Sequence, residues 1–277
     1  MCTVHSFVET ALSGERLYNR SACVPGRRLR LRSGDVVCRC VRVLDLWRYP
    51  VKSLQGEPLA IASVTTAGIE GDRSFALFDV ETGFGLTARR VPELLFASAR
   101  FGDDGGVDIT LPDGSVTSDD HALSEWLGRR VTLRTADTNV TRRYENPVDF
   151  EDEATSEWAP FDGARGAFHD SGGAQISLVS TATIGAWDRR RFRANVYLDG
   201  EGEDAFVGSK MALGDSMLDV DMRIERCVMT TRPQLGGVER DLDVLRTINR
   251  QRGGCLAVGA LVVQPGVVRV GDPLTPI

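Results

Sequence analysis

A strict alternation of apolar and polar residues runs from Met217 to Arg226. Successive side chains of an extended strand point to opposite faces, so the apolar residues share one face and most of the charged residues share the other. This pattern predicts a half-buried strand. The same parity places Cys227 on the polar face, just beyond the strand's C-terminal end.

Short extended segments separated by Gly, Pro and Asp continue along the chain from Val41 onward. Their length and punctuation are typical of strands. Two pairs are expected to form hairpins, residues 73–78 with 86–89 and residues 255–263 with 267–270. Further strands are expected at 41–49, 58–64 and 175–180. We predict an α+β fold that is mainly β and barrel-like.

Three helices are expected between these strands. The first covers residues 119–127, with Ser118 as its N-cap and Gly128 at its end. The second covers residues 181–187 and begins after Ser180. The third aligns three apolar residues on one face, namely Leu242, Leu245 and Ile248.

Changes in composition divide the chain into three parts. Residues 1–39 mix arginines with glutamates without a clear period, so we interpret them as an N-terminal extension. Residues 40–137 are predicted to form a first β-barrel domain. Residues 138–277 are predicted to form a second domain, which opens with a long polar connection up to Gly166.

The charge balance favours a small-molecule ligand over a polyanionic partner. A formal net charge of −6 provides no long-range attraction to nucleic acid or to an anionic membrane surface. The six cysteines lack the dense spacing of secreted disulfide scaffolds, and no apolar run reaches the roughly 18 residues of a membrane span. We therefore expect a cytoplasmic protein that contacts neither nucleic acid nor a membrane.

Several common catalytic motifs are missing or misplaced. The chain has no phosphate-binding Gly-Lys loop, no Gly-x-Ser-x-Gly elbow and no His-Glu-x-x-His pair. The spacing Gly83-x-Gly85-x-x-Ala88 matches a dinucleotide fingerprint but leads into no helix, so we reject it. The run 169–171 (His-Asp-Ser) is interpreted as an ordinary loop, and Cys38-x-Cys40 as a fortuitous pair because no second pair exists.

Cys227 has a different setting, because it follows Arg226 and precedes two hydroxyl residues. A neighbouring cation favours the thiolate, which is the form that binds metals. The residues alone leave open a second interpretation, in which Cys227 is a buried small hydrophobe. Cys255, within an apolar segment, keeps that second interpretation.

Six motifs, in the same order and at comparable spacing, resemble the MOSC domain and the β-barrel domain that precedes it. The resemblance runs from about Val41 to the C-terminus and includes the mitochondrial amidoxime-reducing component and its bacterial relatives. The motifs in this chain are Leu-Trp-Arg-Tyr-Pro-Val-Lys-Ser at 46–53, Gly-Ile-Glu-Gly-Asp-Arg at 68–73, Leu-Thr-Ala-Arg at 86–89, Phe-Arg-Ala-Asn at 192–195, Arg-Cys-Val-Met-Thr-Thr at 226–231 and Pro-Gly-Val-Val-Arg-Val-Gly-Asp-Pro at 265–273.

This resemblance implies a molybdenum cofactor (Mo-molybdopterin) enclosed between the two halves, with Cys227 as metal ligand and catalytic residue. It implies a cofactor-binding set formed by Lys52, Ser53, Arg73, Arg193, Asn195 and Arg226. Arg89 is a further member of the same basic wall. The chain departs from the family at 170–175, which lacks the usual proline, and contacts there, including Ser171, are left unassigned.

The resemblance implies an oxidoreductase that removes oxygen from N-hydroxylated small molecules. No ferredoxin domain follows Ile277, so a separate ferredoxin- or flavoprotein-type donor is expected to supply electrons. Two alternatives stay open, a cofactor or sulfur carrier that uses a Cys227 persulfide and a metal-free binding module. Pyridoxal phosphate is disfavoured, because Lys52 and Lys210 are the only lysines and Lys52 already has a role.

Overall fold

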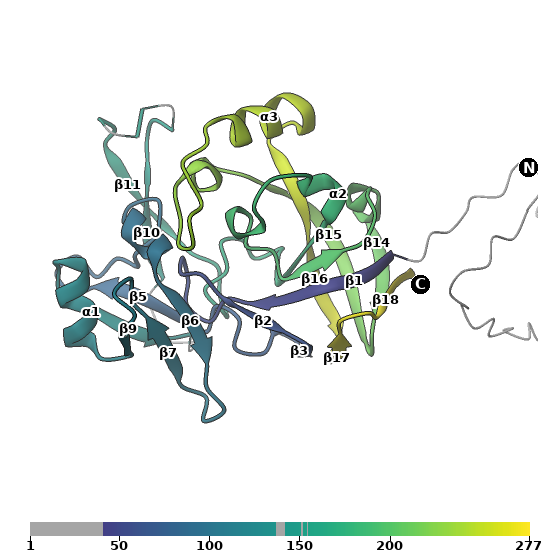
Figure 1. The fold of residues 1–277 in the computed structure, drawn as a ribbon, viewed down its shortest axis with the longest axis horizontal. Coiled ribbons are helices and arrows are strands. Elements are labelled where there is room, and N and C mark those ends of the chain that lie inside the picture. The colour runs from purple at the N-terminus through teal and green to yellow at the C-terminus, as the bar shows by residue number, and fades with distance from the viewer. Residues whose placement is uncertain (1–40, 137–141, 151, 154) are drawn as a thin grey trace, which may run out of the picture. The chain divides into compact units, whose positions relative to one another are not determined.

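The computed structural model describes residues 41–136, 142–150, 152–153 and 155–277 (Figure 1). The chain divides into one unit at Met1–Arg39 and another at Cys40–Ile277, and the description concerns the second. The predicted N-terminal extension and the Cys38-x-Cys40 pair lie outside the described residues.

Seven strands of the described chain close into a barrel, because β1 pairs with both β13 and β18. The β2 strand (Glu57–Leu59) adds to β1 outside the ring. The predicted mainly β, barrel-like fold is therefore confirmed. In order around the ring, the strands are β1 (Val41–Arg48), β13 (Val196–Leu198), β12 (Ile176–Ser180), β16 (Cys255–Gln264), β15 (Ser216–Glu225), β14 (Ser209–Leu213) and β18 (Pro273–Pro276).

The apolar face of β15 fills this barrel. Leu218 and Val220 are fully buried, whereas Asp221 and Arg223 are exposed. The strand predicted from alternation is thus confirmed. Its pairing with β16 contains irregular register steps, one of them between Arg223 and Glu225, just before the chain reaches Cys227.

Smaller sheets build the first half around a separate core. β5 (Phe75–Asp79) pairs with β9 (Val131–Thr135), and a second sheet contains β6 (Ser98–Phe101), β7 (Val107–Thr110) and β8 (Val116–Thr117). The helix α1 (Asp120–Leu127) and the 3-10 helix η1 (Pro92–Phe96) cover this core with Leu123, Leu94 and Leu95.

The predicted helix α1 is confirmed, with a different cap. Asp119, not Ser118, occupies the N-cap position, and its carboxylate accepts a hydrogen bond from the His121 amide at 3.2 Å. A carboxylate is also favoured by the helix dipole at this end. Gly128 ends the helix with a left-handed φ of 62°, as expected for a C-terminal glycine.

The two halves are joined by strands that cross between them. The first strand, β1, belongs to the barrel built mainly by the second half of the chain. Near the C-terminus, β17 (Gly266–Arg269) returns to the first half, where it pairs with β3 (Ile61–Thr65), and β3 also pairs with β4 (Gly68–Ile69). Figure 1 shows β17 beside β3.

One predicted hairpin is wrong in its pairing, and the other forms only in part. β17 pairs with β3 and not with β16, and Pro265 separates β16 from β17 in the chain. The strand β5 takes β9 as its partner. Residues 84–86 still return beside β5, because Gly85 forms an antiparallel bridge with Phe78 and the Leu86 amide donates to the Leu77 carbonyl at 2.7 Å.

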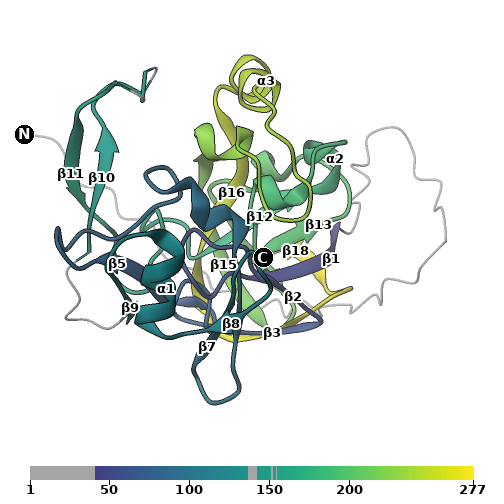
Figure 2. The same cartoon turned by 60° about the vertical axis from the view of Figure 1, so that its left-hand side comes forward.

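The polar stretch predicted to be a connection contains a hairpin of β10 (Arg143–Pro147) and β11 (Trp158–Asp162). The hairpin stands apart from the other strands in Figures 1 and 2. Tyr144 anchors it, because this ring is 2% exposed and packs against Phe78 and Phe168. A few buried aromatic side chains therefore order a segment that is otherwise polar.

The remaining elements differ in detail from the prediction. The predicted strand at 58–64 is divided between β2 and β3, and α2 (Thr181–Ile184) is shorter than expected. In α3 (Asp243–Arg252) the buried residues are Val244 and Ile248, whereas Leu242 is exposed. The other 3-10 helices in the described chain are η2 (Arg189–Arg191), η3 (Glu203–Phe206) and η4 (Val228–Thr231).

Candidate functional site

A cavity of about 530 Å³ contains every residue predicted for the site. This volume lies within the roughly 300–1,000 Å³ of typical small-molecule pockets. The cavity draws side chains from both halves of the described chain. The predicted residues in its lining are Cys227, Lys52, Ser53, Arg73, Arg193, Asn195 and Arg226, and Arg89 also lines it.

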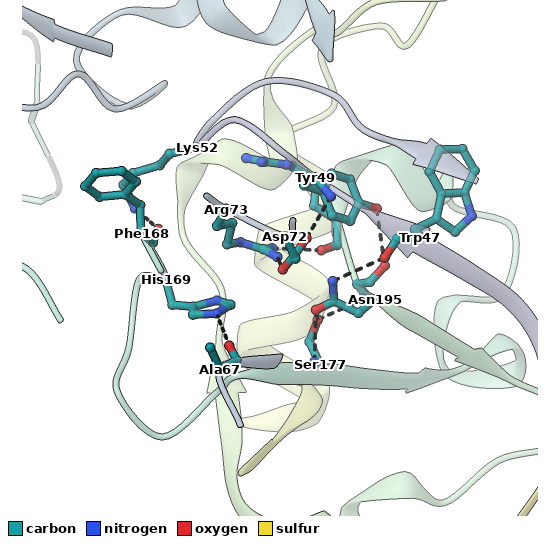
Figure 3. Close-up of polar contacts among 12 residues, drawn as sticks. Trp47, Tyr49, Lys52, Ala67, Asp72, Arg73, Phe168, His169, Ser177 and Asn195 are labelled. Carbon is teal, nitrogen blue, oxygen red and sulfur yellow. Dashed lines mark hydrogen bonds and ion pairs between the residues drawn. The ribbon is translucent and has the colours of Figure 1, made fainter. Parts of the chain in front are cut away.

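Lys52 enters the cavity from the loop after β1, where Pro50 follows the end of the strand. The side chain is only 6% exposed. Its Nζ donates to the Phe168 carbonyl at 3.3 Å, forms an ion pair with Asp170, and lies 5.0 Å from the centre of the Tyr144 ring. Figure 3 shows Lys52 reaching toward Phe168. Its cation is therefore fixed in a protein environment.

Unfavourable backbone conformations concentrate at this cavity. Four non-glycine residues in the described part of the chain have positive φ, and three of them line the cavity: Ser53 at 73°, Arg73 at 51° and Arg193 at 49°. Such conformations cost about 1–3 kcal/mol each, and they persist where the surrounding structure enforces them. Ser53 is fixed in part by its Oγ, which accepts a hydrogen bond from the Ala88 amide at 3.0 Å.

Arg73 is held by the buried carboxylate of Asp72, with which it forms an ion pair. Asp72 in turn accepts a hydrogen bond from the Tyr49 amide at 2.7 Å, and Arg73 Nη2 donates to the Arg193 carbonyl at 3.3 Å. Burial works to lower the pKa of Arg73, but Asp72 and Asp170 outweigh it and raise the pKa above its ordinary value. Arg73 therefore stays charged.

Arg193 and Arg226 have donors that the protein leaves unused. Arg226 donates from Nε to the Leu256 carbonyl at 2.7 Å and from Nη1 to the Phe192 carbonyl at 3.1 Å. Its Nη2 and the Nε of Arg193 are buried without a hydrogen-bond partner among the described residues. Burial lowers the pKa of each guanidinium to about 10, so both remain cations at neutral pH. Unpaired cationic donors favour an anionic ligand.

Asn195 also lines the cavity, but its side-chain amide is bonded to two strands of the barrel. Its Oδ1 accepts hydrogen bonds from the amide and the hydroxyl of Ser177, at 3.1 and 2.9 Å. Its Nδ2 donates to the Trp47 carbonyl at 3.2 Å. Figure 3 shows the amide between these two residues. Asn195 therefore ties β12 to β1 beneath the cavity.

Cys227 follows β15 and begins the short helix η4. Its carbonyl accepts hydrogen bonds from the Thr230 amide and hydroxyl, at 3.1 and 3.0 Å, so its backbone is fixed. The free thiol side chain is partly exposed and lines the cavity. Cys255 was predicted to be a core residue, but it is also partly exposed and lines the same cavity, because it pairs with Glu225 at the pocket end of β15.

The run at 169–171 is a loop, as predicted, and its three residues, His169, Asp170 and Ser171, all line the cavity. Asp170 pairs with Lys52. The Asp170 side chain is 87% exposed, and the charges of Lys52 and Arg73 hold its pKa well below its usual range. The signal for this loop was its place directly before the strand predicted at 175–180, which opens the second domain. Spacing within the loop carried no signal.

Buried His169 gives the site a measurable pH dependence. Burial lowers the pKa of His169, and the positive charge of Arg73 lowers it further. In the unfolded chain a histidine titrates at about pH 6.5, so the imidazole of the folded protein binds a proton less readily. We expect the free energy of unfolding to be fully maintained above about pH 6.5 and to decrease as the pH falls below it. Urea titrations across this range test the expectation. His169→Gln should flatten the decrease, and an unchanged slope in that variant would contradict it.

Comparisons with known proteins match two families in succession. Residues 40–159 match the family described as MOSC N-terminal beta barrel domain, and residues 166–275 match the MOSC domain. The predicted boundary at 137–138 stays a prediction. Among the described residues, no helix has the length and apolar character needed to cross a membrane.

A curated relative is a molybdenum cofactor sulfurase from Drosophila grimshawi, 25% identical over 268 residues that cover 84% of this chain. The chain spans only 34% of that relative's length. Among solved structures, the YUAD protein from Bacillus subtilis has a TM-score of 0.38 at 13% identity, covering 84% of this chain and 93% of that protein. YiiM from Geobacillus stearothermophilus has a TM-score of 0.32 at 18% identity, covering 50% and 73%.

Proposed function

Because the chain belongs to the MOSC family, with a MOSC N-terminal beta barrel domain followed by a MOSC domain, we propose that its cavity binds a molybdenum cofactor (Mo-molybdopterin). In this proposal Cys227 is the protein's ligand to the metal. One observation carries the proposal: a free, partly exposed thiol shares a cavity with several fixed cations.

The residues present fit such a group. A molybdenum–pterin cofactor ends in a phosphate, and the cavity offers cations from Lys52, Arg73, Arg193 and Arg226. The buried donors on Arg193 and Arg226 that have no partner in the described chain suit phosphate or pterin oxygens. Lys52 contributes a point charge and Ser53 a hydroxyl. Cys227 adds a free sulfur to the same cavity, and sulfur is a ligand that soft metals bind.

We further propose that the chain reduces N-hydroxylated compounds. When bound, the cofactor would supply the two-electron chemistry that removes oxygen from nitrogen. The protein's own part is to present the Cys227 sulfur at one position, to hold the anionic end of the cofactor with Lys52 and the arginines, and to leave room in the cavity for a small substrate. Electrons would come from a separate ferredoxin- or flavoprotein-type donor, in a reducing compartment such as the cytoplasm that keeps Cys227 free.

A second candidate function follows from the relative that is a molybdenum cofactor sulfurase. In this second function, Cys227 would carry a persulfide and transfer its outer sulfur to an acceptor without reducing an N-hydroxylated substrate. The similarity spans 84% of this chain. Mass spectrometry separates the two functions, because a persulfide adds one sulfur atom to the peptide that contains Cys227.

Metal and pterin analysis of the purified protein tests the proposal. The protein should be produced in a molybdate-fed host that makes the cofactor, and then assayed for amidoxime or N-hydroxylamine reduction with an added electron donor. We expect molybdenum and pterin in equal amounts, together with reduction. Molybdenum without reduction, and with a Cys227 persulfide, would favour the sulfur carrier. Absence of both metal and pterin would favour a metal-free binding module.

A further inference from the structure

Two cationic residues of the cavity lie over one buried aromatic ring. The guanidinium carbon of Arg73 is 5.2 Å from the centre of the Tyr49 ring, and that of Arg193 is 5.1 Å from it. Tyr49 is 2% exposed, and it does not belong to the cofactor-binding set predicted from the sequence. Figure 3 shows the ring of Tyr49 next to Arg73 and Asp72.

The backbone and hydroxyl of Tyr49 bind to the segments that carry both arginines. Its carbonyl accepts a hydrogen bond from the Arg73 amide at 2.8 Å, and its amide donates to Asp72. Its hydroxyl donates to the carbonyl of Ala194 at 3.2 Å, directly after Arg193. The ring is stacked on Trp47, with centroids 6.3 Å apart. Tyr49 is thus fixed relative to both cations.

The two arginines need such support, because they are buried like charges with left-handed backbones. Burial lowers the pKa of Arg193, and the charge of Arg73 lowers it further. Arg73 has the carboxylate of Asp72, whereas Arg193 has no ion pair within the described residues. The negative face of an aromatic ring attracts a cation, most strongly where water is excluded. For Arg193 the ring of Tyr49 therefore adds a direct cation–π contact to the longer-range attraction of Asp170 and Asp72.

We propose that Tyr49 is a positioning residue for an anion-binding pair of guanidiniums. Its ring holds Arg73 and Arg193 in the cavity wall as charged groups, where they bind the phosphate end of a ligand. The proposal rests on the proposed function only for the identity of that ligand. The anion site itself is tested with inorganic pyrophosphate.

Replacing the ring tests the role of Tyr49. Tyr49→Leu should raise the dissociation constant for pyrophosphate about tenfold, because both cation–π contacts are lost. Tyr49→Phe should stay within about twofold of the wild type, because the ring remains. Phe75→Leu is the matched control: Phe75 is a 7% exposed core aromatic that faces Phe101 and does not line the cavity. It should lower the melting temperature without changing pyrophosphate affinity.

Fluorinated phenylalanines at position 49 separate electrostatics from packing, since they keep the ring's shape and withdraw electron density from its face. Isothermal titration should show affinity for pyrophosphate falling stepwise from phenylalanine through its monofluoro, difluoro and trifluoro forms. A flat series, or a wild-type protein without pyrophosphate affinity, would overturn the proposal. Ring-dependent pyrophosphate binding in a protein that never acquires molybdenum would sustain it while removing the proposed function.

Discussion

Replacing Cys227 by serine is expected to abolish amidoxime reduction while the protein stays folded. The thiol is partly exposed and forms no disulfide, so its loss removes little packing. The hydrogen bonds that fix this position are accepted by the backbone carbonyl, which serine retains. Residues that only support a metal ligand cost about 10–100-fold in metal affinity or activity when mutated, so removal of the ligand should cost at least about 100-fold. Steady-state reduction rates and circular dichroism measure the two effects.

Cys255→Ser is the matched control for this experiment. Cys255 is also a free, partly exposed cysteine that lines the same cavity. Because the proposed ligand is Cys227, the Cys255 variant should retain both molybdenum and reductase activity. If Cys227→Ser retained reduction at the wild-type rate, Cys227 would not be the essential ligand. If both variants lost activity equally, the cavity would depend on its thiols in a way that the proposal does not include.

Local patterns predicted the strands well, because burial of one face of a strand makes apolar and polar residues alternate along its sequence. The alternation before Cys227 is the best example: it requires only that one face be buried, and β15 meets that condition inside the barrel. The helix α1 was predicted for the same reason. Its cap was misassigned, since Ser118 and Asp119 are both good capping residues and only the final geometry decides between them.

Partners of strands could not be predicted in the same way. Local turn residues indicated that 267–270 would fold back on its neighbour, yet β17 pairs with β3, roughly two hundred positions earlier in the chain. At Gly266, the first residue of β17, the backbone lies so close to Asp215 that an added Cβ would be 2.5 Å from the Asp215 carbonyl oxygen. Close backbone contact of this kind is a tertiary constraint that a single sequence does not display.

The candidate site was predicted mainly from resemblance. From the residues alone, Cys227 had two open interpretations, and only the family motifs connected it with Lys52 and Arg193. Asp170 was missed because its partner, Lys52, lies 118 positions away. Tyr49 was missed because a tyrosine at the end of a strand is ordinary in sequence, and its relation to two arginines exists only in the folded chain.

Removal of Lys52 is expected to have the second large effect, a loss of anion binding. Charge-assisted hydrogen bonds contribute about 1.5–3 kcal/mol. Lys52→Met should therefore weaken pyrophosphate binding by about tenfold to more than a hundredfold, and it should lower the molybdenum content of the purified protein. Lys210→Met is the control, because Lys210 is exposed on β14 and does not line the cavity. It should leave both quantities unchanged.

Asp170 makes this prediction sharper. In the wild type its carboxylate is paired with Lys52, so the single variant leaves a negative charge in the cavity without that partner. This charge would repel an incoming phosphate. The double variant Lys52→Met with Asp170→Asn removes the charge, and it should bind pyrophosphate more tightly than Lys52→Met alone but less tightly than the wild type. Titration calorimetry on the wild type, Lys52→Met, Asp170→Asn and the double variant measures the coupling between the two residues. If the double variant bound more weakly than the single one, Asp170 would be a ligand-binding residue and not a competitor for Lys52.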